Sequence, residues 1–415
     1  MLTTPDSEAG QEAVLKDTIV VGLDVGTSKI STIVAEVSAA SIRFIGVSTT
    51  QSRGVRKGMI IDMEAASRAI RTSINAARKL SNTEITDVYA GMADSHVKCM
   101  PNTGAVGIAR GIIRQRDIEW VMETASSIYI PLDKEVMHII PLEYVVDGEG
   151  QITNPLGMRG VRLEANVQIV TGSANSLHNL VRCCEMAGVS VADIVLDPLA
   201  SAMATLRDDE KECGCILVDI GGGTTDIALF RDSRFISTSI LDIGGNQITN
   251  DISVCLAIPL PEAERIQKAY GINEYNAGEI TVATAGGEKK VDGNLISEII
   301  QSRTEEILNL IKTEIAHLCG NATPSFGVIF TGGVAQLKGF EMLAHAVLNI
   351  PVRVGMPEGR DMIEMVRNPI YATAVGLILY AQKSMDDPSS MELLAGDLSH
   401  IRKWIKGLVG KLFSA

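Results

Sequence analysis

The stretch ILVDIGGGTTDIA, residues 216–228, decides how the rest of the chain is interpreted. Its apolar, β-branched start indicates a buried strand, and the glycines at 221–223 force the chain to turn. Glycines let the backbone approach a ligand closely, and successive N–H groups in a turn form a concave anion site. Asp219, at the strand end, can hold a divalent cation through the waters that Mg2+ retains. Alternation from Ile227 onward predicts a return strand, and hence a phosphate-binding β-hairpin.

A second stretch of the same pattern, TIVVGLDVGTSK, occupies residues 18–29. An apolar strand ends at Asp24, a turn contains Gly26, Thr27 and Ser28, and Lys29 begins another alternating run. A single glycine hairpin could be a structural turn without a ligand. Two hairpins of the same design predict two halves of one architecture that face a shared ligand.

A third segment, GVIFTGGVA at residues 327–335, is an apolar run that ends in Thr-Gly-Gly before a helical pattern at 337–348. The bare backbone of Gly332 and Gly333 can lie against a base or a ribose. The three segments, in this order, resemble those of the actin-fold ATPase superfamily. The resemblance implies an α/β, actin-like fold of two ribonuclease-H-like halves around a nucleotide cleft, with ATP and Mg2+ as cofactors.

The composition is that of an ordinary globular protein, with 46% hydrophobic and 21% charged residues among 415. The net charge of −13 argues against nucleic acid as a partner, because a basic stripe is expected there. Seven scattered cysteines without a C-x-x-C pair favour a reducing compartment. Cys213 and Cys215 could contribute to a metal site, but core packing is the favoured alternative. The N-terminal stretch has no apolar signal, and no run approaches the roughly 18 apolar residues of a spanning helix, so we expect a cytosolic protein.

The order of elements predicts a small α+β domain inserted into the first half, because strand-like and helical pieces between 88 and 168 interrupt it. The expected boundaries are a disordered leader at 1–16, a first half at 17–87 and 169–209, the insert at 88–168, a second half at 210–242 and 328–382, a subdomain at 243–327, a linker at 383–398 and a terminal helix at 399–415. Small residues at 198–204 and 371–381 predict two helices that cross closely, either as a hinge between the halves or simply as tight packing.

The last residues form a cationic amphipathic pattern behind a polar linker. The apolar members recur at helical spacing and the basic members occupy the other side. The predicted membrane-binding residues are Ile401, Arg402, Lys403, Trp404, Ile405, Lys406, Leu408, Val409, Lys411, Leu412 and Phe413. Binding to an anionic membrane is favoured over docking on the protein's own core, because a core-docked helix has no need of a purely cationic polar face.

The combination of two glycine hairpins, an inserted domain and a cationic amphipathic tail resembles the FtsA family of bacterial cell-division proteins. The likeness is carried by the tail and by GLDVGTSK (22–29), NPLGMRGVRLE (154–164), DIGGGTTDIA (219–228), FTGGVAQLKG (330–339) and ATAVGLILY (372–380). In that family the insert is called 1C and the halves 1A and 2A, with 2B as the subdomain at 243–327. The resemblance implies a filament-forming protein that links FtsZ to the cytoplasmic face of the inner membrane at the division site and recruits later division proteins through the insert.

The resemblance also assigns site residues. Asp24 and Asp219 would hold the Mg2+ shell. The full nucleotide-binding set is Asp24, Gly26, Thr27, Ser28, Lys29, Asp219, Gly221, Gly222, Gly223, Thr224, Thr225, Gly244, Gly245, Glu264, Gln267, Lys268, Gly332 and Gly333. Related ATPases usually have Glu-x-x-Lys at the base-contacting helix, whereas here Gln267 takes the lysine position and Lys268 follows. The FtsZ C-terminal peptide would bind within 243–327, where Arg303 is either the contact for its carboxylates or part of a solvated helix face.

No sequence pattern identifies the general base that would orient the attacking water for hydrolysis. Asp197, before Pro198, is only a candidate. Positioning and charge dominate phosphoryl transfer, so we expect slow or undetectable ATP hydrolysis. Four alternatives remain open. A sugar kinase needs a catalytic Asp and has no use for the tail; an Hsp70-like chaperone needs a β-sandwich domain after the ATPase; a PilM-type pilus-assembly protein shares the insert but lacks the tail; an MreB-like filament protein lacks the insert.

Overall fold

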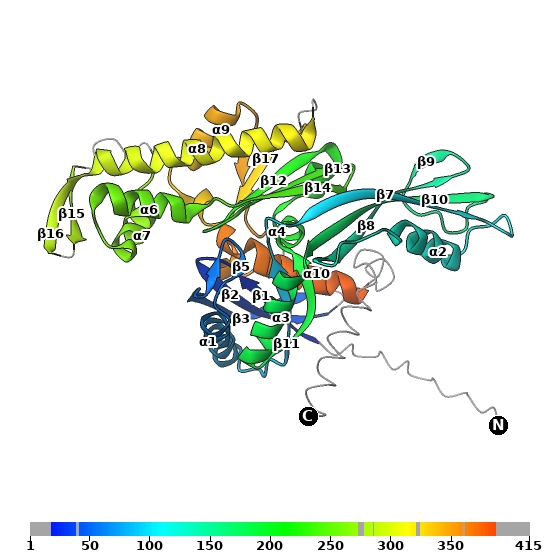
Figure 1. Ribbon diagram of the computed structural model, residues 1–415, viewed down its shortest axis with the longest axis horizontal. Coiled ribbons are helices and arrows are strands. Elements are labelled where there is room, and N and C mark those ends of the chain that lie inside the picture. Colours follow the sequence, from blue (N-terminus) through cyan, green and yellow to red (C-terminus); the bar gives the residue numbers. More distant parts are fainter. Residues whose placement is uncertain are drawn as a thin grey trace, which may run out of the picture.

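The computed structural model describes residues 18–38, 41–272, 278–284, 286–320, 324–359 and 362–386 (Figure 1). The first of its two large sheets has the strand order β11-β6-β1-β2-β3. Its members are β1 (Thr18–Val25), β2 (Lys29–Val37), β3 (Ile42–Gln51), β6 (Asp87–Met92) and β11 (Ser190–Leu196). The first three strands are antiparallel neighbours, and β6 and β11 run parallel to β1.

The second large sheet repeats that design, with the order β14-β13-β12-β17-β18. Its members are β12 (Cys215–Ile220), β13 (Thr225–Arg231), β14 (Arg234–Leu241), β17 (Val328–Thr331) and β18 (Val352–Val354). Again a three-stranded antiparallel unit is followed by two parallel strands. The predicted pair of halves is therefore confirmed at the level of sheet topology.

Helices cover both faces of the first sheet, because its strands alternate buried residues between two cores. The four helices are α1 (Met63–Ser81), α3 (Ala174–Ala187), α4 (Asp197–Thr205) and α10 (Ala372–Asp386). Val21 and Leu23 face α1 and α3, whereas Val20 faces α10. Asp62 caps α1, and its Oδ1 accepts the Ala65 amide at 2.9 Å.

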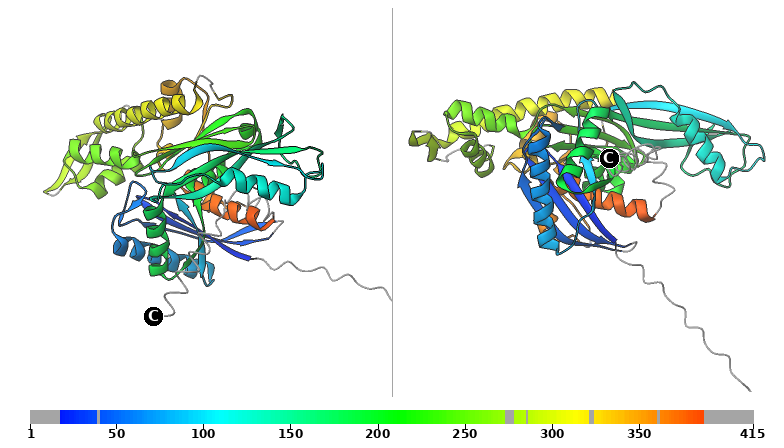
Figure 2. Two further views of the ribbon diagram at one scale, coloured as in Figure 1. Left: turned by 45° about the vertical axis from the view of Figure 1, so that its right-hand side comes forward. Right: turned by 60° about the horizontal axis from the view of Figure 1, so that its bottom comes forward.

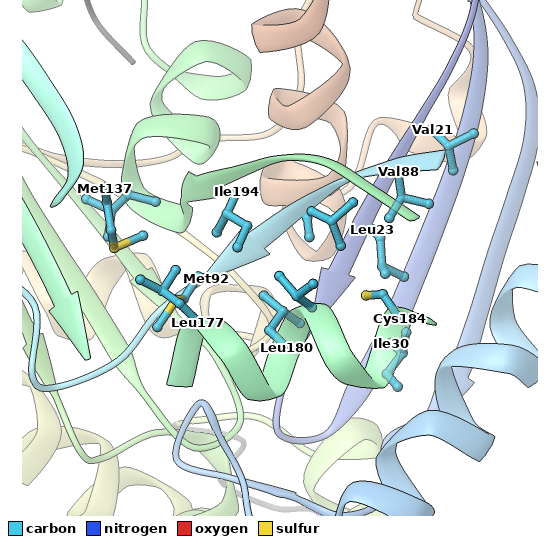
Figure 3. Close-up of a cluster of buried hydrophobic side chains, with 14 of the residues drawn as sticks. Val21, Leu23, Ile30, Val88, Met92, Met137, Leu177, Leu180, Cys184 and Ile194 are labelled. Atoms are coloured by element: carbon cyan, nitrogen blue, oxygen red, sulfur yellow. The ribbon is translucent and has the colours of Figure 1, made fainter. Parts of the chain in front are cut away.

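The predicted insert is a four-stranded antiparallel sheet of order β7-β10-β8-β9 with one helix on it. It consists of β7 (Lys98–Gly107), α2 (Gln115–Ser126), β8 (Lys134–Val146), β9 (Glu149–Ile152) and β10 (Arg162–Ser173). Val121 of α2 packs on Leu163 and Val167 in a core of its own. The insert also joins its neighbours: Met137 of β8 belongs to the same buried cluster as Met92 and Leu177 (Figure 3), and β7 and β8 both contact β14 of the second sheet.

A mainly helical subdomain extends from the second sheet, at the opposite end of the molecule from the insert (Figures 1 and 2). It contains α6 (Gly245–Leu256), α7 (Leu260–Ala269), β15 (Glu279–Thr284), β16 (Gly287–Asp292) and α8 (Gly293–Cys319). Asp292 caps the long α8, and its Oδ1 accepts the Asn294 amide at 2.9 Å. The remaining elements are β4 (Val55–Arg56), β5 (Met59–Ile60), α5 (Asp208–Cys213), α9 (Phe340–Leu348) and the 3-10 turns η1 (Val334–Gln336), η2 (Glu364–Val366) and η3 (Pro369–Tyr371).

The two helices of small residues, α4 and α10, cross as predicted. A Cβ atom added at Gly376 of α10 would lie 1.8 Å from the carbonyl oxygen of Ala200 in α4. On the sheet side, a Cβ atom at Gly22 would lie 2.5 Å from the carbonyl oxygen of Ala374. The backbones therefore touch at this crossing, and any larger side chain at these glycines would push the packed elements apart.

The C-terminal end of the described chain differs from the prediction, because α10 continues to Asp386 instead of ending near Ala381. The first residues of the expected linker are therefore helical. The leader at 1–16, the rest of the linker and the amphipathic tail with Trp404 and its neighbours lie outside the described residues. Within the described ranges, no helix has the length and apolar character needed to cross a membrane.

The α4–α10 crossing gives a first prediction. Gly376→Val should lower the free energy of unfolding by about 2 kcal/mol or more, because the new side chain overlaps a buried backbone carbonyl. Chemical denaturation of both proteins measures this. Gly107→Val is the matched control, since a Cβ atom at Gly107 has nothing within 4 Å. Equal effects of the two substitutions would contradict the close crossing.

Candidate nucleotide-binding site

The two predicted hairpin turns lie directly against each other. Within each turn the first glycine donates to the carbonyl that ends the turn, Gly26 to Lys29 and Gly221 to Thr224, both at 3.0 Å. A Cβ atom on Gly222 would lie 1.9 Å from the Ser28 hydroxyl. One on Gly223 would lie 2.6 Å from the Thr27 hydroxyl. The hydroxyls of the first turn thus occupy the space that the missing side chains of the second leave free.

The start of α6 closes over the second turn. The amides of Gly245 and Asn246 donate to the carbonyls of Gly221 and Gly222 at 2.9 and 2.8 Å. Asn246 also accepts the Ser28 hydroxyl at 2.9 Å, so one hydrogen bond joins the two halves directly. Gly244 is required here, because its Cβ atom would lie 2.6 Å from the Gly221 carbonyl. The structure therefore brings the two turns and Gly244–Gly245 together at one place.

Four aspartates gather beneath the turns. Asp24 pairs with the ammonium of Lys29 at 2.8 Å. Asp219 accepts hydrogen bonds from the hydroxyls of Ser201 at 3.0 Å and Thr373 at 3.4 Å. Burial nevertheless raises the pKa of the Asp219 carboxyl to about 6.

The other two aspartates are more deeply enclosed. Burial, followed by the charges of Asp24, Asp226 and Asp219, raises the pKa of the Asp197 carboxyl well above its usual value. Burial, followed by Asp219 and Asp24, does the same to the pKa of Asp226. Oδ1 of Asp197 and Oδ1 of Asp226 have no hydrogen-bond partner within the described chain. Buried oxygens of this kind are costly unless something cationic or a water satisfies them.

The third segment identified in the sequence, residues 327–335, reaches the same aspartate cluster at Gly332. Gly332 has φ +86°, and its Cβ atom would lie 2.3 Å from Oδ1 of Asp219. A Cβ atom on Gly333, by contrast, would meet nothing within 4 Å. Glycine is therefore required at position 332 because the backbone there passes close to the Asp219 carboxylate. The open backbone that a base or ribose would need is at Gly333.

Helix α7, which the family resemblance predicts to contact the base, does not present its predicted residues in the same way. Glu264 and Lys268 pair with each other at 2.6 Å on the surface. The side chain of Gln267 points to α6, where it donates to the Gly245 carbonyl at 3.2 Å and accepts the Thr249 hydroxyl. Gln267 thus supports the start of α6, while Glu264 and Lys268 remain at the surface.

Two other predicted positions lie apart from this cluster. Arg303, on α8, already binds two carboxylates of its own chain, Asp251 and Glu306 at 2.5 and 2.6 Å. Cys215 is fully buried in β12, which confirms core packing for it, whereas Cys213 is exposed, so core packing was wrong for that residue. Among the described residues, no three His, Cys, Asp or Glu side chains are close enough together to hold a metal ion directly.

The sequence did not single out Ser201, Thr373, Asn246 or Asp226. Asp226 carried the clearest signal, because β13 pairs it with Asp219 just as β2 pairs Ser31 with Asp24. Ser201 and Thr373 are hydroxyls inside the two helices of small residues, where a polar side chain invites a search for its partner.

Comparisons with known proteins identify the family. Residues 216–376 match the model for cell division protein FtsA, and residues 94–171 match that for the SHS2 domain inserted in FtsA. The chain is 34% identical over 407 residues to the cell division protein FtsA of Pseudomonas aeruginosa, covering 94% of this chain and 98% of that protein.

Solved structures agree on the fold. The PilM–PilN type IV pilus biogenesis complex superposes with a TM-score of 0.63 at 17% identity, covering 88% of this chain and 98% of that one. MreB5 of Spiroplasma citri bound to ADP gives 0.53 at 13% identity, covering 89% and 98%. These likenesses confirm the actin-like fold, and the much higher sequence identity decides between pilus assembly and cell division. The chain therefore belongs to the FtsA family of cell-division proteins.

Proposed function

We propose that the protein binds ATP with Mg2+, polymerises, and anchors FtsZ filaments to the cytoplasmic membrane through its terminal amphipathic helix, while its insert helps recruit later division proteins. Its place in a cell-division family supports the division role. The observation that carries the nucleotide site is the meeting of two glycine turns above a group of aspartates. ADP in the related fold of MreB5 is consistent with it.

The residues present fit a hydrated Mg2+ ion with ATP. Asp24 and Asp219 are each the next-to-last residue of equivalent strands, β1 and β12, in the two halves, and buried carboxylate oxygens on Asp197 and Asp226 lack partners among the described residues. Mg2+ usually keeps several waters and needs only one or two carboxylates. When bound, the ion would neutralise phosphate charge. Backbone N–H groups of the two turns and the hydroxyls of Thr27 and Thr224 would position the phosphates.

The environment of Asp197 supports slow hydrolysis. Burial and the neighbouring carboxylates raise the pKa of its carboxyl, and the protonated form of a carboxyl cannot accept a proton from an attacking water. The carboxyl group lies at the first turn of α4, where its Oδ1 is the atom closest to a Cβ atom placed on Gly91. We therefore expect nucleotide binding with little turnover.

The metal site gives the second prediction. Wild-type protein should bind ATP more tightly with Mg2+ than with a chelator, and Asp219→Asn should remove most of that difference, because a neutral amide cannot hold the cation's water shell. Titration calorimetry under both conditions measures it. Asp232→Asn, at a surface turn with φ +52°, is the matched control. An unchanged Mg2+ effect in Asp219→Asn would exclude this carboxylate from the metal site.

Membrane binding gives the third prediction. Full-length protein with ATP should co-sediment with anionic liposomes, whereas a chain ending at Leu398 should stay in the supernatant, because it loses all eleven predicted membrane-binding residues. A second variant with Arg402, Lys403 and Lys406 changed to Gln should bind more weakly and lose its preference for anionic lipid. Equal sedimentation of the full and shortened chains would assign the tail a structural role instead.

Arg303 gives the fourth prediction. Arg303→Ala should weaken binding of an FtsZ C-terminal peptide by about tenfold, the usual scale for a charge-assisted hydrogen bond. Fluorescence anisotropy with a labelled peptide measures the affinity. Arg265→Ala is the control, since Arg265 also pairs with a glutamate three residues away. If both variants bind like wild type, Arg303 only holds α8 to α6 through Asp251.

A further inference from the structure

The segment from Ser52 to Gly58 is attached to the first phosphate turn at two points. The Ser52 amide donates to the Ser28 carbonyl at 3.1 Å. The Gly58 amide donates to the Thr27 hydroxyl, also at 3.1 Å. β4 lies between these bonds, and Gly58 is in the turn that joins β4 to β5, so this small hairpin is tied to the first phosphate turn.

Lys57 and Gly58 are placed where both turns meet. A Cβ atom on Gly58, which has φ +73°, would lie 2.1 Å from the Ala93 carbonyl and 3.7 Å from the Thr224 methyl. Lys57 itself has φ +50°, a left-handed conformation that is uncommon for a residue with a long side chain. Backbone held in such a conformation often serves a binding site.

The Lys57 side chain bridges the two halves. Its ammonium lies 3.6 Å from Oδ2 of Asp242, which follows β14 and precedes the turn into α6. The side chains of both residues are partly exposed, at 37% and 41%. A long, half-exposed ion pair of this kind contributes little to stability, so a stronger anion could displace Asp242.

The other lysine of this region is already committed. Lys29 donates to Asp24 at 2.8 Å and to Ser31 at 3.0 Å, both on its own hairpin. Lys57, with one weakly held partner beside the Thr27–Thr224 junction, is the cation that can change partners. The terminal phosphate of ATP carries more charge than a carboxylate and has several acceptor oxygens.

Resting on the proposed ATP site, we propose that Lys57 senses the terminal phosphate: with ATP it leaves Asp242 and contacts that phosphate, and with ADP it stays paired with Asp242. Asp242 is then a competitor for Lys57, and the partner exchange distinguishes triphosphate from diphosphate. No covalent step is involved.

The test compares the affinities of four proteins for ATP and for ADP, each with Mg2+, by titration calorimetry. Lys57→Gln should weaken ATP binding by about tenfold and ADP binding by less than about twofold. Asp242→Asn should bind ATP at least as tightly as wild type, because it releases Lys57. Lys290→Gln, which breaks a surface pair with Glu279, is the control and should change neither affinity.

Two outcomes would overturn the inference while leaving the ATP site intact. Equal weakening of ATP and ADP binding in Lys57→Gln would make Lys57 a general part of the cleft. An equal loss of ATP binding in Lys57→Gln and Asp242→Asn would make the pair a simple latch between the halves. Failure of the proposed ATP site itself would be recognised differently, because wild-type protein would then bind neither nucleotide.

Discussion

The contact between the two glycine turns constrains the rest of the structure. Gly222 and Gly223 have no side chains where Ser28 and Thr27 place their hydroxyls, so the two halves can approach until their turns touch. Contacts from a neighbouring helix hold the two turns in this position. The start of α6 holds the second turn through two amide bonds, and Asn246 extends that support to the first turn. A substitution that separated the turns would therefore disturb both halves at once.

Beneath the turns, the negative charge of several aspartates is only partly compensated. Four aspartates share a region in which Lys29 is already paired, and burial keeps the pKa of Asp219 at about 6. Such an arrangement is unfavourable for the protein alone and favourable once a cation is present. The hydroxyls of Ser201 and Thr373 link this charge to α4 and α10, so the helices that cross between the halves also contact the Asp219 carboxylate. Binding chemistry and the relative position of the halves thus share the same side chains.

Local signals allowed much of this to be predicted. A strand, an aspartate and a glycine turn are encoded within a dozen residues, so both hairpins followed from the sequence, as did the crossing of the small-residue helices. Partners far apart in the chain were not predictable in the same way. No local sequence pattern indicates that Ser28 donates to Asn246 or that Thr373 donates to Asp219. Gln267 illustrates the same limit, because the family resemblance assigned it to the nucleotide site and only the fold shows that it donates to the Gly245 carbonyl.

The backbone contact between Gly376 and Ala200 has a mechanical consequence. Gly376 places no side chain between the two helix backbones, while Leu377 of α10 packs in one cluster with Ala200 of α4, so the helices cannot slide past each other without collision. If the two halves rock against each other, we expect this crossing to be the pivot. The insert and the helical subdomain lie at opposite ends of the molecule, and so serve as two lever arms of very different shape (Figure 2). A small angular adjustment near the phosphate turns would be magnified into a larger displacement at both ends, where a chain that assembles end to end would feel it as curvature.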